Sequence, residues 1–260
     1  MTFGIVIPLK SRKISRDWTV TSSALERTVK SILGQTNNDF VAVIAGHDKP
    51  DFLEKLNDNR IIFTKVTFDV PDRSAPGFTN QLLINDKVLK IMAGLVALKN
   101  YSLSWVYQLD SDDLMRKDFI ETIENKAKSS AFIIEGGYVY YERFNRIVET
   151  AEMDSLCGSI AVIDPTTFTF PETPDLRYIN DIPWTKYRHM NIHKFYSEVT
   201  TGTVTKINDN LVSYILASGD NFSDRWREGI ISKLKASLKP YIYGKRPSTS
   251  FKEQFSLLDK

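Results

Sequence analysis

The sequence is poor in the features that mark specialised classes of protein. Cys157 is the single cysteine among 260 residues, which excludes an internal disulfide framework and is expected of a protein in a reducing compartment. No apolar run approaches the roughly 18 residues of a membrane span, and the N-terminus lacks the charged-then-apolar layout of a signal peptide. We therefore expect a cytoplasmic protein.

An excess of charge of either sign is also absent. Lys and Arg total 34 against 32 Asp and Glu, so nucleic acid is not an expected partner and any bound anion needs a local site. The sequence shows no internal repeat or low-complexity segment and does not indicate an oligomeric state. Because 42% of the residues are hydrophobic, the chain can bury a full core. We expect one domain over residues 1–219 and a C-terminal helical extension and tail over 220–260.

The first half alternates between strand and helix patterns. Short apolar runs predict buried strands over residues 3–9, 40–45 and 60–66. Helical patterns lie between them, over residues 23–34 and 51–56. Ser23 and Glu26 have the spacing of a capping box at the start of the first helix, and Gly34 is expected to end it. Such alternation favours an α/β fold with a mostly parallel, Rossmann-like sheet and helices on both faces.

The rest of the chain adds shorter elements. A helix, a strand and a second helix are predicted over residues 85–100, 104–109 and 118–128. Partly antiparallel strands are predicted over 131–135, 138–144, 146–150 and 159–163. The aromatics of "YVYYERF" either line a sugar site or pack in the core. Residues 222–242 have the pattern of a basic amphipathic helix, followed by a polar tail.

The cations of that last helix permit peripheral contact with the inner face of a membrane, although a solvated charged face is the simpler explanation. They are Arg225, Arg227, Lys233, Lys235 and Lys239.

The stretch "LDSDD" places Asp110, Asp112 and Asp113 directly behind the strand predicted over 104–109. With 20 Asp in the chain, chance alone gives roughly 1.5 Asp-x-Asp matches, so the bare motif is weak. Its position is more informative, because open parallel sheets bind ligands beyond the carboxyl ends of their strands. Crowded carboxylates there favour a hard cation, Mg²⁺ or Mn²⁺, that bridges to phosphates. A solvated acidic turn is the alternative.

Four cations are candidates for binding a diphosphate. Lys10 and Arg12 follow the first strand, where they could approach the phosphates. Lys87 and Lys90 lie one turn apart on the helix before the aspartates, so both could face one anion. For each pair, a solvated surface is the alternative.

The order of these segments resembles the nucleotide-diphospho-sugar glycosyltransferases of the GT-A fold, especially the family-two type. The phrase "LERTVKSILGQTNNDF", then "FVAVIAGHD" and "WVYQLDSDDLM", are the parts that match, and the resemblance covers roughly residues 3–190. The ending "SFKEQFSL" is similar to a bacterial rhamnosyltransferase subgroup. The resemblance implies transfer of a sugar from a nucleotide-sugar donor to a saccharide or lipid-linked acceptor, with inversion. A processive synthase is disfavoured, because Phe222 stands where its motif has glutamine.

The resemblance also implies roles for the aspartates. Asp112 becomes the principal metal ligand, Asp110 lies near the ribose or the metal, and Asp113 assists. His189 is a further candidate for the metal or the diphosphate, and His193 has a weaker claim.

A base pocket is expected between the loop after Pro8 and the loop after the second strand, with Asp48 accepting from the base. Family members often carry two acids in that second loop, where this chain has Gly46, His47 and Asp48. The alternative for Asp48 is a loop-capping acid.

The acceptor side is expected in "YINDIPWTKYRHM", which resembles the family's acidic pair followed by an arginine. Asn180 replaces the first acid, Asp181 is the second, and Arg188 is the arginine. Asp181 is the candidate base that takes the acceptor's proton. Its alternative role is a helix N-cap ahead of Pro183.

Two other functions stay open. A sugar-phosphate nucleotidyltransferase usually has a glycine-rich loop after its first strand, and "PLKSRK" contains no glycine. A non-catalytic nucleotide- or glycan-binding domain would retain the fold without a base, and Asn180 in place of an acid favours it. Cys157, Gly158 and Ser159 precede the strand over 159–163 and either approach a ligand or form an ordinary turn.

Overall fold

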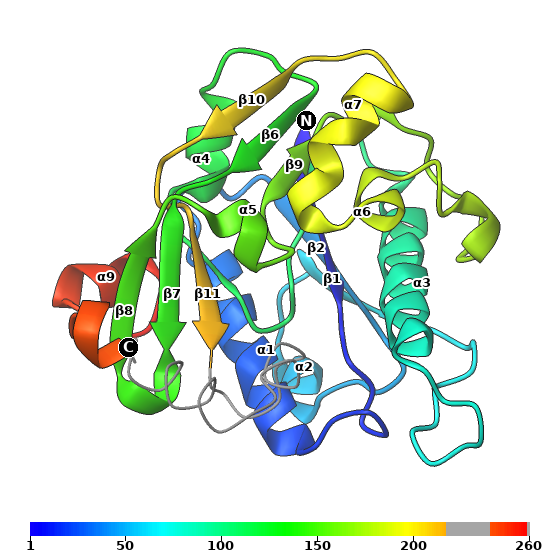
Figure 1. Ribbon diagram of the computed structural model, residues 1–260, viewed down its shortest axis with the longest axis horizontal. Helices are drawn as coiled ribbons and strands as arrows, with labels where there is room; N and C mark the ends of the chain where they lie inside the picture. The colour runs from blue at the N-terminus through cyan, green and yellow to red at the C-terminus, as the bar shows by residue number, and fades with distance from the viewer. Residues whose placement is uncertain (217–239, 259–260) are drawn as a thin grey trace.

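The computed structural model describes residues 1–216 and 240–258 and contains two sheets (Figure 1). The larger has seven strands in the order β10-β6-β9-β4-β1-β2-β3, and the smaller has four in the order β5-β11-β7-β8. Arg225 to Lys239, on which the expected basic helix depends, lie outside the described residues. Within those that are described, no helix is long and apolar enough to cross a membrane.

The first half supplies four adjacent strands of the large sheet, from β4 near its middle to β3 at its edge. Its strands are β1 (Thr2–Pro8), β2 (Phe40–Gly46), β3 (Ile61–Lys65) and β4 (Leu103–Gln108). Its helices are α1 (Trp18–Leu33), α2 (Asp51–Lys55) and α3 (Asn80–Leu98). Strand β1 pairs in parallel with β2 and β4, and β2 pairs in parallel with β3. The predicted mostly parallel sheet is therefore confirmed.

The second half supplies the remaining strands. They are β5 (Leu114–Met115), β6 (Ala131–Ile134), β7 (Gly137–Tyr141), β8 (Arg146–Thr150), β9 (Ala161–Ile163), β10 (Val204–Ile207) and β11 (Val212–Leu216). Strand β9 is antiparallel to β4 and β6, and β7 is antiparallel to β8, as predicted. Strands β5, β10 and β11 were not predicted. The sequence signal is weak for β5, which has two residues, and for β10, which is largely exposed.

The helices of this half are short. The α-helices are α4 (Phe119–Glu124), α5 (Met153–Leu156), α6 (Pro183–Lys186), α7 (Phe195–Glu198) and α9 (Thr249–Gln254). The 3-10 turns are η1 (Glu142–Phe144), η2 (Pro165–Thr167), η3 (Leu176–Tyr178) and η4 (His189–Lys194).

Several predicted helix boundaries are wrong. Helix α1 begins at Trp18 rather than Ser23, because the side chain of Asp17 accepts hydrogen bonds from the backbone N–H groups of Thr19 and Val20 at 2.8 and 3.4 Å. The expected capping box is therefore not the start of this helix. Helix α3 begins before its predicted range, and α4 ends at Glu124. The predicted end of α1 at Gly34 is confirmed.

Helices cover both faces of the large sheet. On one face Phe119 of α4 contacts Phe3 and Tyr107, with ring centroids 6.1 and 4.7 Å apart. On the other, α3 packs against β1 so closely that a Cβ atom on Gly94 would lie 2.4 Å from Cγ1 of Val6. Phe3 and Val6 point to opposite faces because side chains alternate along a strand. Figure 1 shows α3 running beside β1. The central strands of the large sheet are therefore covered on one face by α4 and on the other by α3.

The small sheet is covered by the C-terminal segment. Tyr138 and Tyr140 of β7 pack against Phe251 and Phe255, which are buried at 4% and 0% exposure. Helix α9 accordingly lies beside this sheet in Figure 1. The core-packing interpretation of the "YVYYERF" aromatics is confirmed. The expectation of a polar tail is wrong for this segment, because its two phenylalanines are part of a core.

Gly94→Ala is expected to destabilise the protein by about 1–3 kcal/mol, because the new methyl group overlaps Val6. A loss of stability would be informative, because replacing glycine with alanine in a helix interior ordinarily stabilises a protein. Thermal or urea unfolding measures the change. Adding Val6→Ala should restore part of the loss by making room for the methyl. A Gly94→Ala protein at least as stable as the parent would contradict the close α3–β1 packing.

Candidate functional site

The aspartate turn joins the two sheets at the carboxyl ends of β1 and β4. Leu109, just after β4, donates its backbone N–H to the carbonyl of Val6 at 2.9 Å. The turn closes with a hydrogen bond from the N–H of Asp113 to the carbonyl of Asp110 at 3.2 Å, and β5 follows at once. The predicted position of the aspartates, behind a central strand, is confirmed.

Asp113 is the buried anchor of this turn. Its side chain is fully buried; one carboxylate oxygen accepts from the Ser159 hydroxyl at 2.6 Å and the other from the Ile215 N–H at 3.3 Å. Burial, followed by the charges of Asp112 and Asp110, raises the pKa of Asp113 well above its ordinary value. Both oxygens already have protein donors, so this carboxylate holds the turn together. Its assisting role at a metal stays a prediction.

Asp110 is paired with a cation from α3. Its Oδ1 accepts from Nε2 of Gln108 at 2.7 Å and lies 2.5 Å from Nζ of Lys87. Burial alone would raise the pKa of Asp110, but the charge and hydrogen bond of Lys87 outweigh burial and lower it. The same pair raises the pKa of Lys87 against the effect of burial. The Lys87 side chain is 45% exposed, whereas that of Asp110 is 21% exposed.

Asp112 differs because, among the described residues, no Lys, Arg or His forms an ion pair with it. Burial and then the charge of Asp110 raise the pKa of Asp112 to about 6, while Lys10 and Lys87 oppose the rise. A partly buried carboxylate whose pKa is raised in this way destabilises the folded state when it is ionised.

A divalent cation at the aspartate turn would need oxygen ligands from its carboxylates. In the part of the chain described, no group of three or more His, Cys, Asp or Glu is arranged to hold a metal. Two carboxylates suffice for Mg²⁺, which keeps most of its waters and bridges to phosphates. The Lys87 ammonium already stands as a cation on Asp110, and Asp112 beside it has none. Asp110 and Asp112 therefore fit a cation shared with a ligand.

The segment before β9 forms a wall of the turn. A Cβ atom on Gly158 would lie 2.9 Å from Oδ2 of Asp110 and 3.4 Å from Nζ of Lys87. Ser159 also accepts from the N–H of Asp110 at 2.9 Å, and Tyr107 donates to the Ser159 carbonyl at 2.8 Å. Sequence reasoning singled out this segment but missed that Ser159 positions the aspartates. A small residue pair directly before a buried strand was the available signal.

The loops after β1 and β2 are tied together. The N–H of Arg12 donates to Oδ2 of Asp48 at 2.8 Å, and the Arg12 guanidinium lies over the Trp18 ring at 5.4 Å from its centroid. Pro8, the last residue of β1, pairs with Ala45 of β2. Asp48 thus accepts a hydrogen bond from the neighbouring loop after β1, whereas its alternative role was to cap its own loop before Pro50. Binding of a base by Asp48, or of a diphosphate by Lys10 and Arg12, stays a prediction.

Lys87 and Lys90 do not share an anion. Lys90 is 1% exposed and its Nζ lies 2.6 Å from Oδ2 of Asp86, one turn away on α3. Burial lowers the pKa of Lys90, and Asp86 offsets part of that shift. The alternative of a solvent-facing surface is therefore wrong for Lys90. Sequence reasoning missed Asp86, although its spacing of four residues from Lys90 was a signal.

The acceptor candidates lie on turns around α6 and η4. Asp181 is exposed, and the N-cap of α6 is Ile182, which makes no side-chain capping bond. The helix-cap alternative for Asp181 is therefore wrong, while its role as base stays a prediction. Trp184 donates to the carbonyl of Ala161 in β9 at 3.2 Å, and both α6 and η3 contact α3. This loop is thereby held against the helix that carries Lys87.

His189 begins η4, and Arg188 is the N-cap residue before it. Arg188 is exposed, and Nδ1 of His189 lies 2.6 Å from the carbonyl of Asp154 in α5. His189 is close enough to Asp110 to add to the lowering of that carboxyl's pKa, after Lys87 and Gln108. His189 is thus held on α5, and its role at a metal or diphosphate stays a prediction, whereas His193 is exposed.

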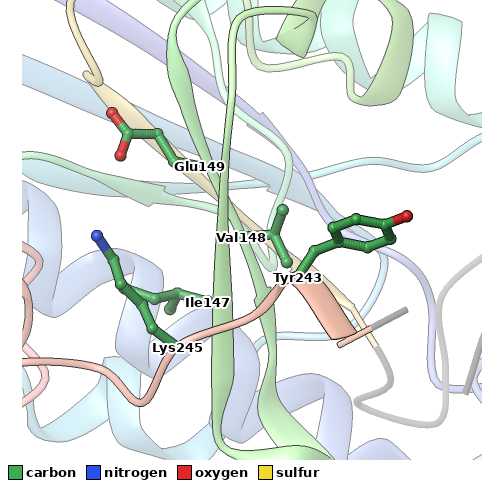
Figure 2. A pocket seen from close by; sticks show the side chains of 5 residues that line it. All are labelled: Ile147, Val148, Glu149, Tyr243 and Lys245. Atoms are coloured by element: carbon green, nitrogen blue, oxygen red, sulfur yellow. The ribbon is translucent and has the colours of Figure 1, made fainter. Parts of the chain in front are cut away.

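A separate pocket lies away from this site (Figure 2), lined by Ile147, Val148, Glu149, Tyr243 and Lys245. It sits on β8, where Ile147 and Lys245 form an antiparallel bridge. Strands β8 and β5 are the opposite edges of the small sheet, and the aspartates adjoin β5. This pocket therefore does not belong to the candidate site.

The chain is similar in fold to solved enzymes of nucleotide chemistry. With S. aureus TarS 1–349 it shares 12% identity at a TM-score of 0.48, over 83% of this chain and 60% of that one. The same protein in complex with UDP-GlcNAc gives 14% and 0.47, over 86% and 61%. The inositol-1-phosphate CTP transferase from T. maritima gives 12% and 0.46, over 92% and 96%.

The chain thus spans about 60% of the length of TarS 1–349. No protein-family model matches the sequence, and no curated protein matches it. These likenesses assign no activity to this chain.

Asp112→Asn is expected to stabilise the ligand-free protein at pH 8 and to lose much of that advantage in acid. Because the pKa of Asp112 is raised from 3.8 to about 6 on folding, the ionised carboxylate lowers stability above pH 6. As the pH falls through 6 towards 3.8 the folded state takes up the proton, and the cost disappears. The expected gain at pH 8 is roughly 1–3 kcal/mol, falling to about half at pH 5.

Urea unfolding in chelator at both pH values measures this difference, with the exposed Asp209→Asn as the matched control. A gain that is the same at both pH values would contradict the raised pKa of Asp112.

Proposed function

We propose that the protein transfers a sugar from a nucleotide-diphospho-sugar to a hydroxyl group of a saccharide or lipid-linked acceptor. The observation that carries the proposal is the aspartate turn at the carboxyl ends of β1 and β4. Within the part of the chain that the structure describes, Lys87 supplies a paired cation to Asp110 and none pairs with Asp112. Carboxylates and ammonium groups together at such an edge suit a metal-bound nucleoside diphosphate better than a neutral ligand.

The donor lies along the edge formed by the loops after β1 and β2. Asp48 holds the base-side loop through its bond to Arg12, and Lys10 and Arg12 face the diphosphate. Asp110 and Asp112 hold Mn²⁺ or Mg²⁺, which when bound offsets the charge that builds on the leaving diphosphate. Asp113 and Ser159 keep both carboxylates in place.

The acceptor approaches from the side of α6. Asp181 is exposed and makes no capping bond, so its carboxylate is accessible to an acceptor hydroxyl. It takes the proton of that hydroxyl as the oxygen attacks the anomeric carbon, which inverts the configuration. Arg188 and His189 follow at the start of η4, and His189 acts on the diphosphate side through its proximity to Asp110.

A nucleotidyltransferase would instead join a nucleoside triphosphate to a sugar phosphate and release pyrophosphate. Such enzymes wrap the triphosphate with a glycine-rich loop after the first strand, and this chain has "LKSRK" there. The glycosyl-transfer proposal is therefore preferred. Release of pyrophosphate from nucleoside triphosphates in the presence of sugar phosphates would favour the other activity.

Nucleoside diphosphates are expected to bind tightly with Mn²⁺ or Mg²⁺ and weakly with chelator. Calorimetry with UDP, GDP, CDP and dTDP measures the affinities and identifies the base. Asp112→Ala should abolish the metal-dependent part, whereas Asp209→Ala, on an exposed surface, should leave it unchanged. Equal affinity with metal and with chelator would refute the metal role of Asp112.

Asp181→Asn is expected to retain donor binding while transfer falls by about 10²-fold or more, because the amide has the same shape but cannot accept the proton. Single-turnover transfer at saturating donor measures the step, and the donor dissociation constant is determined separately. Unchanged turnover would eliminate Asp181 as the base. The other acids to test would then be Glu152, Asp154 and Asp175.

A further inference from the structure

Lys87 is the only described cation in direct contact with either proposed metal ligand. Its Nζ lies 2.5 Å from Oδ1 of Asp110, the same oxygen that accepts from Gln108. A divalent ion on that carboxylate would meet the ammonium at close range, and two cations at one oxygen repel each other strongly. Ion binding and the Lys87–Asp110 pair therefore compete.

The surroundings of Lys87 leave its ammonium room to move. The side chain is 45% exposed and ends a flexible four-carbon stem. Gly158 lies near the ammonium, and a Cβ atom at that position would be 3.4 Å from Nζ of Lys87. A larger residue there would confine the ammonium, so the glycine keeps this space open.

Lys90 provides the contrast on the same helix. Its side chain is 1% exposed, and its ammonium is paired with Asp86, whose side chain is 9% exposed. Moving that charge would require opening the core between α3 and the sheet, whereas moving Lys87 requires only a rotation of an exposed side chain. Although the two lysines lie one turn apart, only Lys87 can leave its carboxylate partner without opening the core.

We propose that Lys87 exchanges partners during donor binding. In the empty site its ammonium is paired with Asp110; when a divalent cation binds with the donor, Lys87 leaves Asp110 and pairs with the diphosphate. This inference rests on the proposed function and adds to it that the cation and the nucleotide bind cooperatively. The lysine opposes the cation alone and favours the two together, so Asp110 has a cationic partner in both states.

Lys87→Met separates the two effects, because it removes the ammonium and keeps much of the stem. Without nucleotide, the variant should bind Mn²⁺ roughly five- to tenfold more tightly than the parent. With saturating Mn²⁺, it should bind nucleoside diphosphates about tenfold more weakly. Electron paramagnetic resonance of free Mn²⁺ measures the first affinity, and calorimetry with UDP, GDP, CDP and dTDP measures the second.

Two variants serve as controls. Lys87→Arg keeps the charge and should retain the weak Mn²⁺ binding of the parent. Lys99→Met makes the same substitution at the C-terminal end of α3, in an exposed pair with Glu172, and should change neither affinity. Circular dichroism melting confirms that each variant folds.

The outcomes distinguish this inference from the proposed function. If the parent binds Mn²⁺ and Lys87→Met binds it equally or more weakly, the exchange is overturned while the metal site stands. If the parent binds Mn²⁺ neither alone nor with any of the four nucleotides, both the metal site and the exchange are overturned. A purely structural role for Lys87 cannot produce a tighter Mn²⁺ site together with a weaker nucleotide site.

Discussion

The buried carboxylate of Asp113 is the constraint on which the site depends. It accepts from Ser159, in the segment before β9 of the large sheet, and from Ile215, in β11 of the small sheet. A buried acid with two donors from different sheets holds those sheets in one relative position. The turn that carries Asp110 and Asp112 is consequently held at the junction of the two sheets rather than on a freely moving loop.

Three aspartates within one turn acquire three different properties from their neighbours. Asp113 is anchored and has a raised pKa, and Asp110 is ion-paired and has a lowered pKa. Asp112 has no paired cation among residues 1–216 and 240–258, and its pKa is about 6. Burial acts on all of them in the same direction, so the differences come from specific partners. The result is one structural carboxylate and two that are suited to share a ligand.

Helix α3 connects the two halves of the site. It packs on β1 through Gly94, places Lys87 on Asp110, and contacts the α6 segment that follows Asp181. The packing against β1 determines the position of Lys87 relative to the aspartate turn, because both the helix and the end of β4 are held by the same strand. The same helix therefore fixes the positions of residues on the donor side and on the acceptor side of the site.

The sequence by itself determined the alternation of strands and helices, the parallel sheet and the position of the aspartates behind β4, because these follow from hydrophobic periodicity over neighbouring residues. It did not determine where α1 begins, which depends on Asp17, or the presence of the two-residue β5. Only the tertiary structure decided that Lys87 pairs with Asp110 while Lys90 is buried against Asp86, and that Asp113 is an anchor. Ser159 and Ile215 lie 46 and 102 residues from Asp113, and contacts over such separations depend on how the sheets are assembled, which no local pattern records.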